Sequence, residues 1–160
     1  MKALDRYILE KFQITKDSKI MYYPKDKFEL RKILEERLSK DKDADLNDID
    51  VSNITDMGYD NFDDDRGLFE NLDPHNINIS EWNVSNVINM DDMFWDCRNF
   101  NCDLSNWNVS NVINMNHMFW LCEKFKGQGL ENWKPIKCEN MEDMFYRCDS
   151  LKNEPKWYKN

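Results

Sequence analysis

Acidic side chains are the most strongly clustered of the potentially functional groups in this 160-residue chain. Residues 45–103 contain 15 Asp and Glu residues against two Lys and Arg residues, a net charge of −13, whereas the whole chain carries −9. A field of this sign attracts basic surfaces and repels nucleic acid. The block has two interpretations, a docking surface for a basic protein partner or a solvated charged face. Its candidate binding residues are Asp60, Asp63, Asp64, Asp65, Asp91, Asp92 and Asp96.

Metal binding is the next chemistry that such residues suggest. An EF-hand register starting at Asp60 fails, because Phe62 stands where the loop needs an oxygen ligand. Calcium stays an alternative on the number of carboxylates alone. Zinc is not indicated, because no two Cys or His residues show the short paired spacing of a zinc site. The prediction is therefore no metal and no cofactor.

Three aromatic residues recur at one position of the sequence and are the apolar candidates for partner binding: Trp95, Trp120 and Tyr146. On a helical wheel with Met90 at zero, Trp95 lies about 140° away, outside the apolar stripe. An exposed aromatic column would anchor a partner strongly. The alternative is that the rings pack sideways between adjacent helices.

The cysteines and histidines form no catalytic pattern. Cys97, Cys122 and Cys148 recur at one position, which favours a buried column of reduced thiols, with disulfides between neighbouring coils as an alternative. His75 and His117 have no Cys or Ser partner at a recurrent spacing. The four glycines form no phosphate-binding loop. We expect a protein that is not an enzyme.

An internal repeat must position all of these groups. The stretch WNVSNVINM occurs unchanged at Trp82–Met90 and Trp107–Met115, an offset of 25 residues. A unit this short cannot bury its own apolar face, so its copies must stack. The copies are one degenerate unit from about residue 45 with an acidic insertion at about 59–66, fuller units at about 77–101, 102–126 and 127–152, and a truncated unit ending near 157.

Two periodicities alternate within a copy. Ile77 and Ile79 alternate with polar residues, which predicts a short strand. Helical spacing follows, at Val87, Met90, Phe94 and Cys97, with Ser85 as the expected N-cap. The predicted fold class is therefore an α/β solenoid, with one short strand and one short helix in each repeat of about 25 residues.

The region before the repeats is predicted to be a helical cap. Residues 1–44 would form this N-terminal cap and residues 45–160 the repeat region. Asp26 followed by Glu29 resembles a capping box for a helix over about Lys27–Leu38. Repeat arrays need such caps to cover their open ends.

The repeat resembles the BspA-type leucine-rich repeat family. The similarity rests on LSNWNVSNVINM at Leu104–Met115, followed by Met118–Phe119 and Cys122, and it covers residues 45–157. The resemblance implies a right-handed leucine-rich-repeat-like solenoid with binding roles and no catalytic residues. Many relatives are bacterial surface lipoproteins or adhesins, so a surface adhesin or structural repeat protein is the alternative function.

The chain also departs from that family. Charges interrupt what would be the apolar stretch of a secretion signal at its start, and no apolar run approaches the roughly 18–20 residues of a membrane helix. Pro135–Cys138 replaces the expected Val-Ser-Asn-Val. Glu10–Lys19 is similar to the openings of small phage-encoded repeat proteins. We expect a cytoplasmic protein, of its producer or of an infected host.

Together these features predict a non-catalytic protein–protein interaction module. Its acidic half, residues 45–103, would bind a protein with a basic surface, and it would bind neither nucleic acid nor membrane. The phage-like opening implies a more specific version, an inhibitor of a host nucleic-acid-binding defence enzyme.

Overall fold

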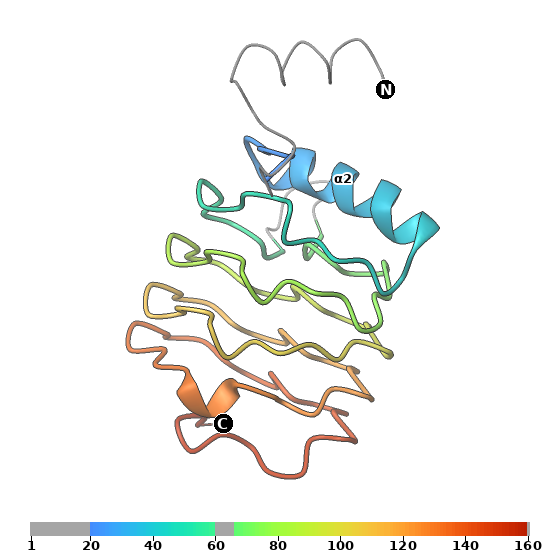
Figure 1. Cartoon of the computed structure of the whole chain (residues 1–160). Coiled ribbons are helices and arrows are strands. Elements are labelled where there is room, and N and C mark those ends of the chain that lie inside the picture. The colour runs from blue at the N-terminus through green and yellow to red at the C-terminus, as the bar shows by residue number, and fades with distance from the viewer. Residues whose placement is uncertain (1–19, 60–65, 160) are drawn as a thin grey trace, which may run out of the picture.

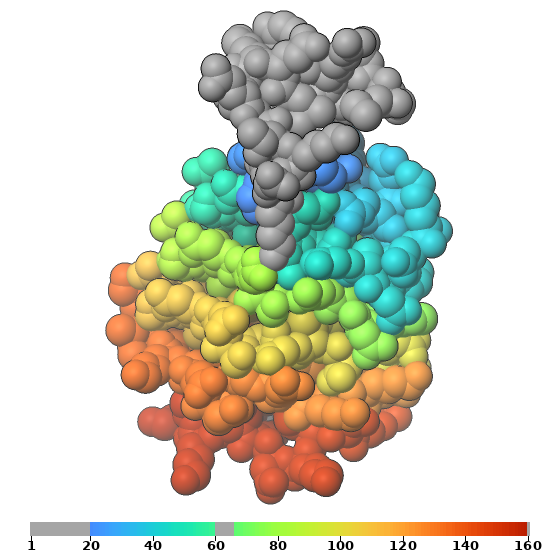
Figure 2. Space-filling view, viewed as in Figure 1, coloured from blue at the N-terminus to red at the C-terminus, as the bar shows by residue number. Residues whose placement is uncertain are grey.

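A computed structural model describes residues 20–59 and 66–159 of the chain. In this part the regular elements are one α-helix, α2 (Lys27–Lys40), and one short 3-10 helix, η1 (Leu130–Asn132). The remaining described chain winds into coils that lie one below another under α2 (Figure 1). In the space-filling view the coils form successive bands from the helix to the C-terminal end (Figure 2).

Helix α2 covers the apolar end of the first coil. Asp26 caps the helix, because its Oδ1 accepts a hydrogen bond from the Glu29 backbone N–H at 2.8 Å. The Glu29 side chain reaches back to the backbone N–H of Lys25, at 2.8 Å. The helix buries three leucines spaced at i, i+4 and i+8: Leu30, Leu34 and Leu38. The predicted helix over about Lys27–Leu38 is therefore confirmed.

The predicted α/β leucine-rich-repeat-like solenoid is wrong. Residues 20–59 and 66–159 contain no β-strand, and no α-helix occurs in any of the repeat copies described there. Neighbouring coils are joined by isolated parallel bridges of single residues instead of by a sheet. One series of such bridges runs from coil to coil through Asp56, Asn89, Asn114 and Asn140.

Backbone hydrogen bonds explain why the helical spacing in residues 90–97 did not produce a helix. Alternate N–H groups point to the next coil: Met90 to the Asn114 carbonyl at 2.9 Å and Phe94 to the Met118 carbonyl at 3.0 Å. Asp92 is left-handed, with φ 53°, which interrupts a right-handed helix. Successive tight turns therefore bury the apolar positions that a helix face would have buried.

The strand prediction failed for a related reason. Ile77 and Ile79 are buried and Asn78 is exposed, as alternation predicts, but only Asn78 bridges another coil. Ser85 caps no helix. Its backbone N–H and hydroxyl instead donate to Asn83 Oδ1, at 3.2 and 2.7 Å. A single bridged residue at this position is too little to form a ladder of strands.

The copy at residues 127–152 departs from the alternation seen at Ile77–Ile79. At the positions equivalent to Ile77 and Asn78, Gln128 is exposed and Gly129 is buried, the reverse of the arrangement in the earlier copy. Gly129 has φ 90° and precedes η1. A Cβ there would lie 2.2 Å from the backbone nitrogen of Ser105, so only glycine allows this close approach between coils.

Rows of equivalent side chains form the core between coils. The rings of Phe69, Phe94, Phe119 and Phe145 follow one another with centroid separations of 4.9, 5.5 and 5.7 Å. A second row consists of Trp82, Trp107 and Trp133. Each indole donates its Nε1–H to a backbone carbonyl of the preceding coil, at 3.0 Å. Equivalent positions of the repeat thus occupy equivalent environments in successive coils.

The recurrent cysteines form a third row. Each thiol donates a hydrogen bond to a phenylalanine carbonyl of the preceding coil. The pairs are Cys97 to Phe69 at 3.2 Å, Cys122 to Phe94 at 3.1 Å and Cys148 to Phe119 at 3.0 Å. All three thiols are free and buried, which confirms the predicted buried column. Burial raises the pKa of the Cys97 and Cys122 thiols well above the ordinary value.

Candidate functional site

The recurrent aromatic position forms a row of stacked rings on the outside of the coils. Trp95 and Trp120 are parallel within 1° with centroids 5.1 Å apart, and Trp120 stacks on Tyr146 at 4.2 Å. Trp95 and Trp120 are half-buried, whereas Tyr146 is 49% exposed. These three residues are termed the outer ladder. Their rings pack on one another and leave their edges available, and binding of a partner there remains a prediction.

His117 connects the outer ladder to two carboxylates. Its ring stands perpendicular to the indoles of Trp95 and Trp120, with centroids 5.5 and 5.2 Å away. Its Nδ1 lies 3.3 Å from Oδ1 of Asp92. Asp91, Asp92 and His117 can each place one ligand atom within 4.8 Å of the other two. This group is termed the Asp–Asp–His cluster.

The coils position the cluster through short asparagine turns. Asn89 Oδ1 accepts the backbone N–H of Asp91 at 3.1 Å, two residues later. Asn114 makes the equivalent turn one coil on, just before His117. Asp92 and His117 are both left-handed, with φ of 53° and 51°, so their side chains leave the two coils in the same way.

The two carboxylates are only partly satisfied. Oδ1 of Asp91 and Oδ1 of Asp92 are shielded from solvent and have no hydrogen-bond partner among the described residues. Burial and, next, the charge of Asp91 together raise the pKa of Asp92 to about 6, against the opposing effect of His117. Burial also raises the pKa of Asp91, while a hydrogen bond with the Asn114 side chain opposes the increase. Negative charge here is therefore costly unless a cation approaches.

The predicted acidic residues are brought together only in part. Asp91 and Asp92 lie beside the outer ladder through His117, whereas Asp96 pairs with Arg98 at 2.8 Å. Arg98 also pairs with Glu123 of the next coil, at 2.9 Å. The remaining predicted positions lie outside the described residues: Asp60, Asp63, Asp64 and Asp65.

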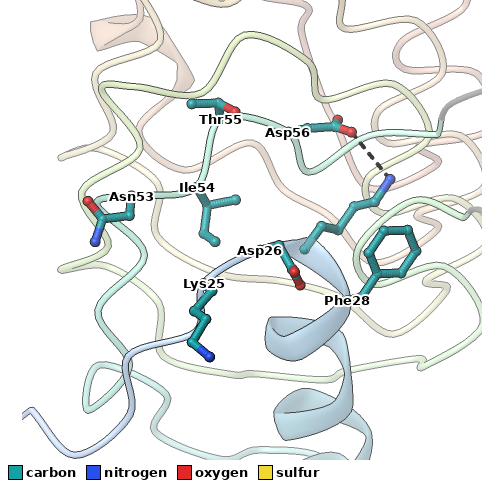
Figure 3. Close-up of a pocket in the computed structure, with 8 residues that line it drawn as sticks. Lys25, Asp26, Phe28, Asn53, Ile54, Thr55 and Asp56 are labelled. Carbon is teal, nitrogen blue, oxygen red and sulfur yellow. Dashed lines mark hydrogen bonds and ion pairs between the residues drawn. The ribbon is translucent and has the colours of Figure 1, made fainter.

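A second polar group lies where α2 meets the first coil (Figure 3). Lys27 is buried, its Nζ lies 3.4 Å from Asp56 Oδ2, and it donates to the Gly58 carbonyl at 2.6 Å. The adjoining hollow has a volume of about 200 Å³, below the roughly 300 Å³ at which small-molecule pockets begin. These contacts fasten the cap helix to the first coil.

Sequence reasoning did not identify the Asp–Asp–His cluster. It considered His117 only as a histidine without a catalytic partner and treated Asp91 and Asp92 as part of a general acidic field. The signal was nevertheless in the spacing, because His117 follows Asp92 by 25 residues, one repeat length. Equivalent positions of stacked units must be neighbours, so an Asp and a His in one column were bound to meet.

Comparison with known proteins decides the family. A family model described as "Mycoplasma protein of unknown function, DUF285" matches residues 28–158. The chain belongs to the DUF285 family. The match begins inside α2 and includes every described coil, so the DUF285 unit comprises both the cap helix and the repeats. No curated protein and no solved structure matches the chain.

These findings correct the earlier family assignment. The matching family is DUF285, so the identification as a BspA-type leucine-rich repeat protein is wrong. The comparisons contain no support for a phage origin or for an inhibitor. In the described part of this DUF285 protein, no helix is both long enough and apolar enough to cross a membrane.

Proposed function

We propose that this protein is a non-catalytic interaction module that binds a basic protein partner at the outer ladder and the adjoining carboxylates. The observation that carries the proposal is the contact of His117 with both the outer-ladder indoles and Asp92. That contact makes the aromatic row and the acidic residues one continuous surface. Large aromatic side chains are the commonest anchors of protein interfaces.

The composition of the surface favours lysine- or arginine-rich partners. Asp91 and Asp92 each retain a carboxylate oxygen without a hydrogen-bond partner among the described residues. An arginine side chain placed beside these carboxylates would offset their negative charge and contact the edge of the indole rings through its alkyl chain. The net charge of −13 over residues 45–103 would increase the rate of encounter with such a partner.

The test uses a displayed library of random peptides selected on the full chain. We expect enrichment of peptides with net positive charge, whose affinity falls about tenfold between low and physiological salt because the pairing is electrostatic. Fluorescence anisotropy with one enriched peptide then measures the variants. Trp120→Ala should weaken binding by about tenfold or more, as expected for an interface anchor.

Two variants serve as matched controls. Ile113 is exposed at a different repeated position, so Ile113→Ala should leave the affinity unchanged. Glu131→Gln removes an exposed acidic charge outside the acidic region and should also have little effect. Selection of neutral or acidic peptides, or equal losses for Trp120→Ala and Ile113→Ala, would contradict the proposal.

A further inference from the structure

The Asp–Asp–His cluster has the spacing of ligands that share one small ion. When zinc is bound tetrahedrally at about 2.0–2.1 Å, neighbouring ligand atoms lie about 3.3 Å apart. Nδ1 of His117 and Oδ1 of Asp92 are separated by 3.3 Å, and Asp91 supplies a third ligand atom within the same group. The polypeptide therefore brings together three ligand atoms for such an ion, all within 4.8 Å of one another.

The surroundings of these atoms are suited to a cation. Oδ1 of Asp92 lies 3.3 Å from Nδ1 of His117, but neither it nor Oδ1 of Asp91 accepts a hydrogen bond from the residues that the structure describes. Both oxygens are shielded from water, so solvent does not replace the absent donors. Burying carboxylate oxygens in this way is unfavourable unless a positive group pairs with them.

Neighbouring residues hold the ligands in place. The imidazole of His117 packs perpendicular to the stacked rings of Trp95 and Trp120 and contacts both. Stacking of one coil on the next fixes the backbone of Asp92 relative to that of His117. Ligand positions that are set before binding reduce the entropy lost when the ion arrives.

The donor set selects among metals. Calcium takes six to eight oxygen ligands and magnesium an octahedron of oxygens, whereas imidazole suits zinc and its transition-metal neighbours. Three protein ligands leave one position for water or for an outside group. We propose that Asp91, Asp92 and His117 form a binding site for a divalent transition-metal ion, with zinc as the reference ion. This inference shares Asp91 and Asp92 with the proposed partner site, but its test requires no partner.

The direct test is zinc titration of the full chain carrying Cys138→Ser. That substitution removes the one thiol that is not buried among the five cysteines, which could otherwise bind zinc. Isothermal titration calorimetry should show one strong site per chain that excess magnesium or calcium does not displace. Asp92→Asn and His117→Asn should each weaken zinc binding by about tenfold or more, because each removes one of three ligands.

The substituted residue is chosen to preserve the backbone. Asparagine tolerates the left-handed conformation that both positions adopt, with φ of 53° and 51°. Asp143 occupies the equivalent position of the next coil, with φ 48°, but does not belong to the cluster. Asp143→Asn is therefore the matched control and should bind zinc like the parent protein.

A second measurement requires no substitution in the cluster. The chain contains two histidines, His75 and His117. In protein labelled with ¹⁵N at histidine, zinc should shift the ring nitrogen signals of His117 and leave those of His75 unchanged. Unchanged His117 signals at saturating zinc would overturn the proposal. So would zinc affinities in Asp92→Asn and His117→Asn equal to that of Asp143→Asn.

Discussion

Two rows of stacked rings run along the coils. They are one residue apart in sequence, yet one row is buried and the other is partly exposed to solvent. Phe94, Phe119 and Phe145, termed the inner ladder, are at most 6% exposed. The outer ladder of Trp95, Trp120 and Tyr146 has comparable stacking, with centroid separations of 5.1 and 4.2 Å against 5.5 and 5.7 Å inside. Ring geometry is therefore shared, and solvent exposure is what differs.

This difference in exposure gives the two ladders different roles, the inner one in stability and the outer one in recognition. Complete burial of a phenylalanine side chain contributes about 1.5–3 kcal/mol, whereas an aromatic contact beyond its buried area adds about 0.5–1.5 kcal/mol. The inner ladder benefits from both effects and the outer ladder mainly from the second. The outer rings can therefore change without loss of the fold, which suits a surface that contacts other molecules.

The largest expected effect is that of removing one inner ring. Phe119 is fully buried and stacks on Phe94, Phe125 and Phe145. Phe119→Ala should lower the free energy of unfolding by about 3–5 kcal/mol, because it leaves a cavity that neighbouring coils cannot fill. Urea denaturation followed by circular dichroism measures this change.

The adjacent outer residue provides the comparison. Trp120→Ala removes a larger ring but should cost only about 1 kcal/mol, because this indole is half-buried and loses mainly stacking. Equal destabilisation by Phe119→Ala and Trp120→Ala would show that the two ladders do not differ as described.

The next effect concerns a buried hydrogen bond. Trp107 donates its Nε1–H to the Ile79 carbonyl at 3.0 Å and is buried. Trp107→Phe keeps most of the apolar contact but removes one of two hydrogen bonds to the Ile79 carbonyl, the other coming from the Trp82 backbone N–H at 3.2 Å. It should therefore cost about 1.5 kcal/mol. Thermal unfolding of Trp107→Phe and Trp95→Phe compares the inner and outer sides. No hydrogen bond from Trp95 Nε1 occurs among the described residues, so Trp95→Phe should cost less stability. A loss of stability in Trp95→Phe as large as that in Trp107→Phe would contradict this account.

Local signals in the sequence predicted the cap helix well. Asp26 and Glu29 act within one turn of the chain, so the start of α2 depends on neighbours that the sequence shows directly. Burial at the recurrent positions was also predictable, since identical residues one repeat apart must meet similar surroundings. Phe94 and Cys97 are buried as that reasoning requires.

The form of the backbone was not predictable in the same way. Asp92 and Asp96 are four residues apart and both left-handed, so successive turns reproduce the spacing of a helix without being one. The bonds that decide against the helix join residues more than 20 positions apart, such as Phe94 N–H and the Met118 carbonyl. Hydrophobic periodicity reports which side chains are buried and does not distinguish a turn series from a helix.

The candidate site was likewise predictable only in part. The outer ladder was found because its residues share a type, whereas the Asp–Asp–His cluster combines different types in equivalent positions. Aligning the repeats by position places His117 below Asp92, and this comparison is informative wherever copies stack directly. The positions Asp60, Asp63, Asp64 and Asp65 remain a prediction outside the described residues.

The smallest expected effect concerns the charge beside the outer ladder. The pKa of Asp92 is raised to about 6 by burial first and by Asp91 second, from an ordinary value of 3.8. The native state therefore binds this proton more tightly than the unfolded state, so the penalty on folding grows as the pH rises above 3.8 and is complete above about pH 6. Asp92→Asn removes the penalty and should raise the free energy of unfolding at pH 7.5 by about 1 kcal/mol, less than the full shift because water screens a partly exposed group.

The stability difference between Asp92→Asn and the parent protein should depend on pH. As the pH falls from 7.5 to 4.5, Asp92 becomes protonated in the native state, so the advantage of Asp92→Asn over the parent should shrink, and it should vanish only below the unfolded-state pKa of 3.8. Urea denaturation at both pH values, with a chelator present, measures it, and Asp143→Asn controls for general loss of negative charge. An advantage that stays constant with pH, or one that Asp143→Asn shares, would mean that ionised Asp92 is not under strain. The acidic side of the outer ladder would then be an ordinary solvated surface, and the inner and outer ladders would differ in exposure alone.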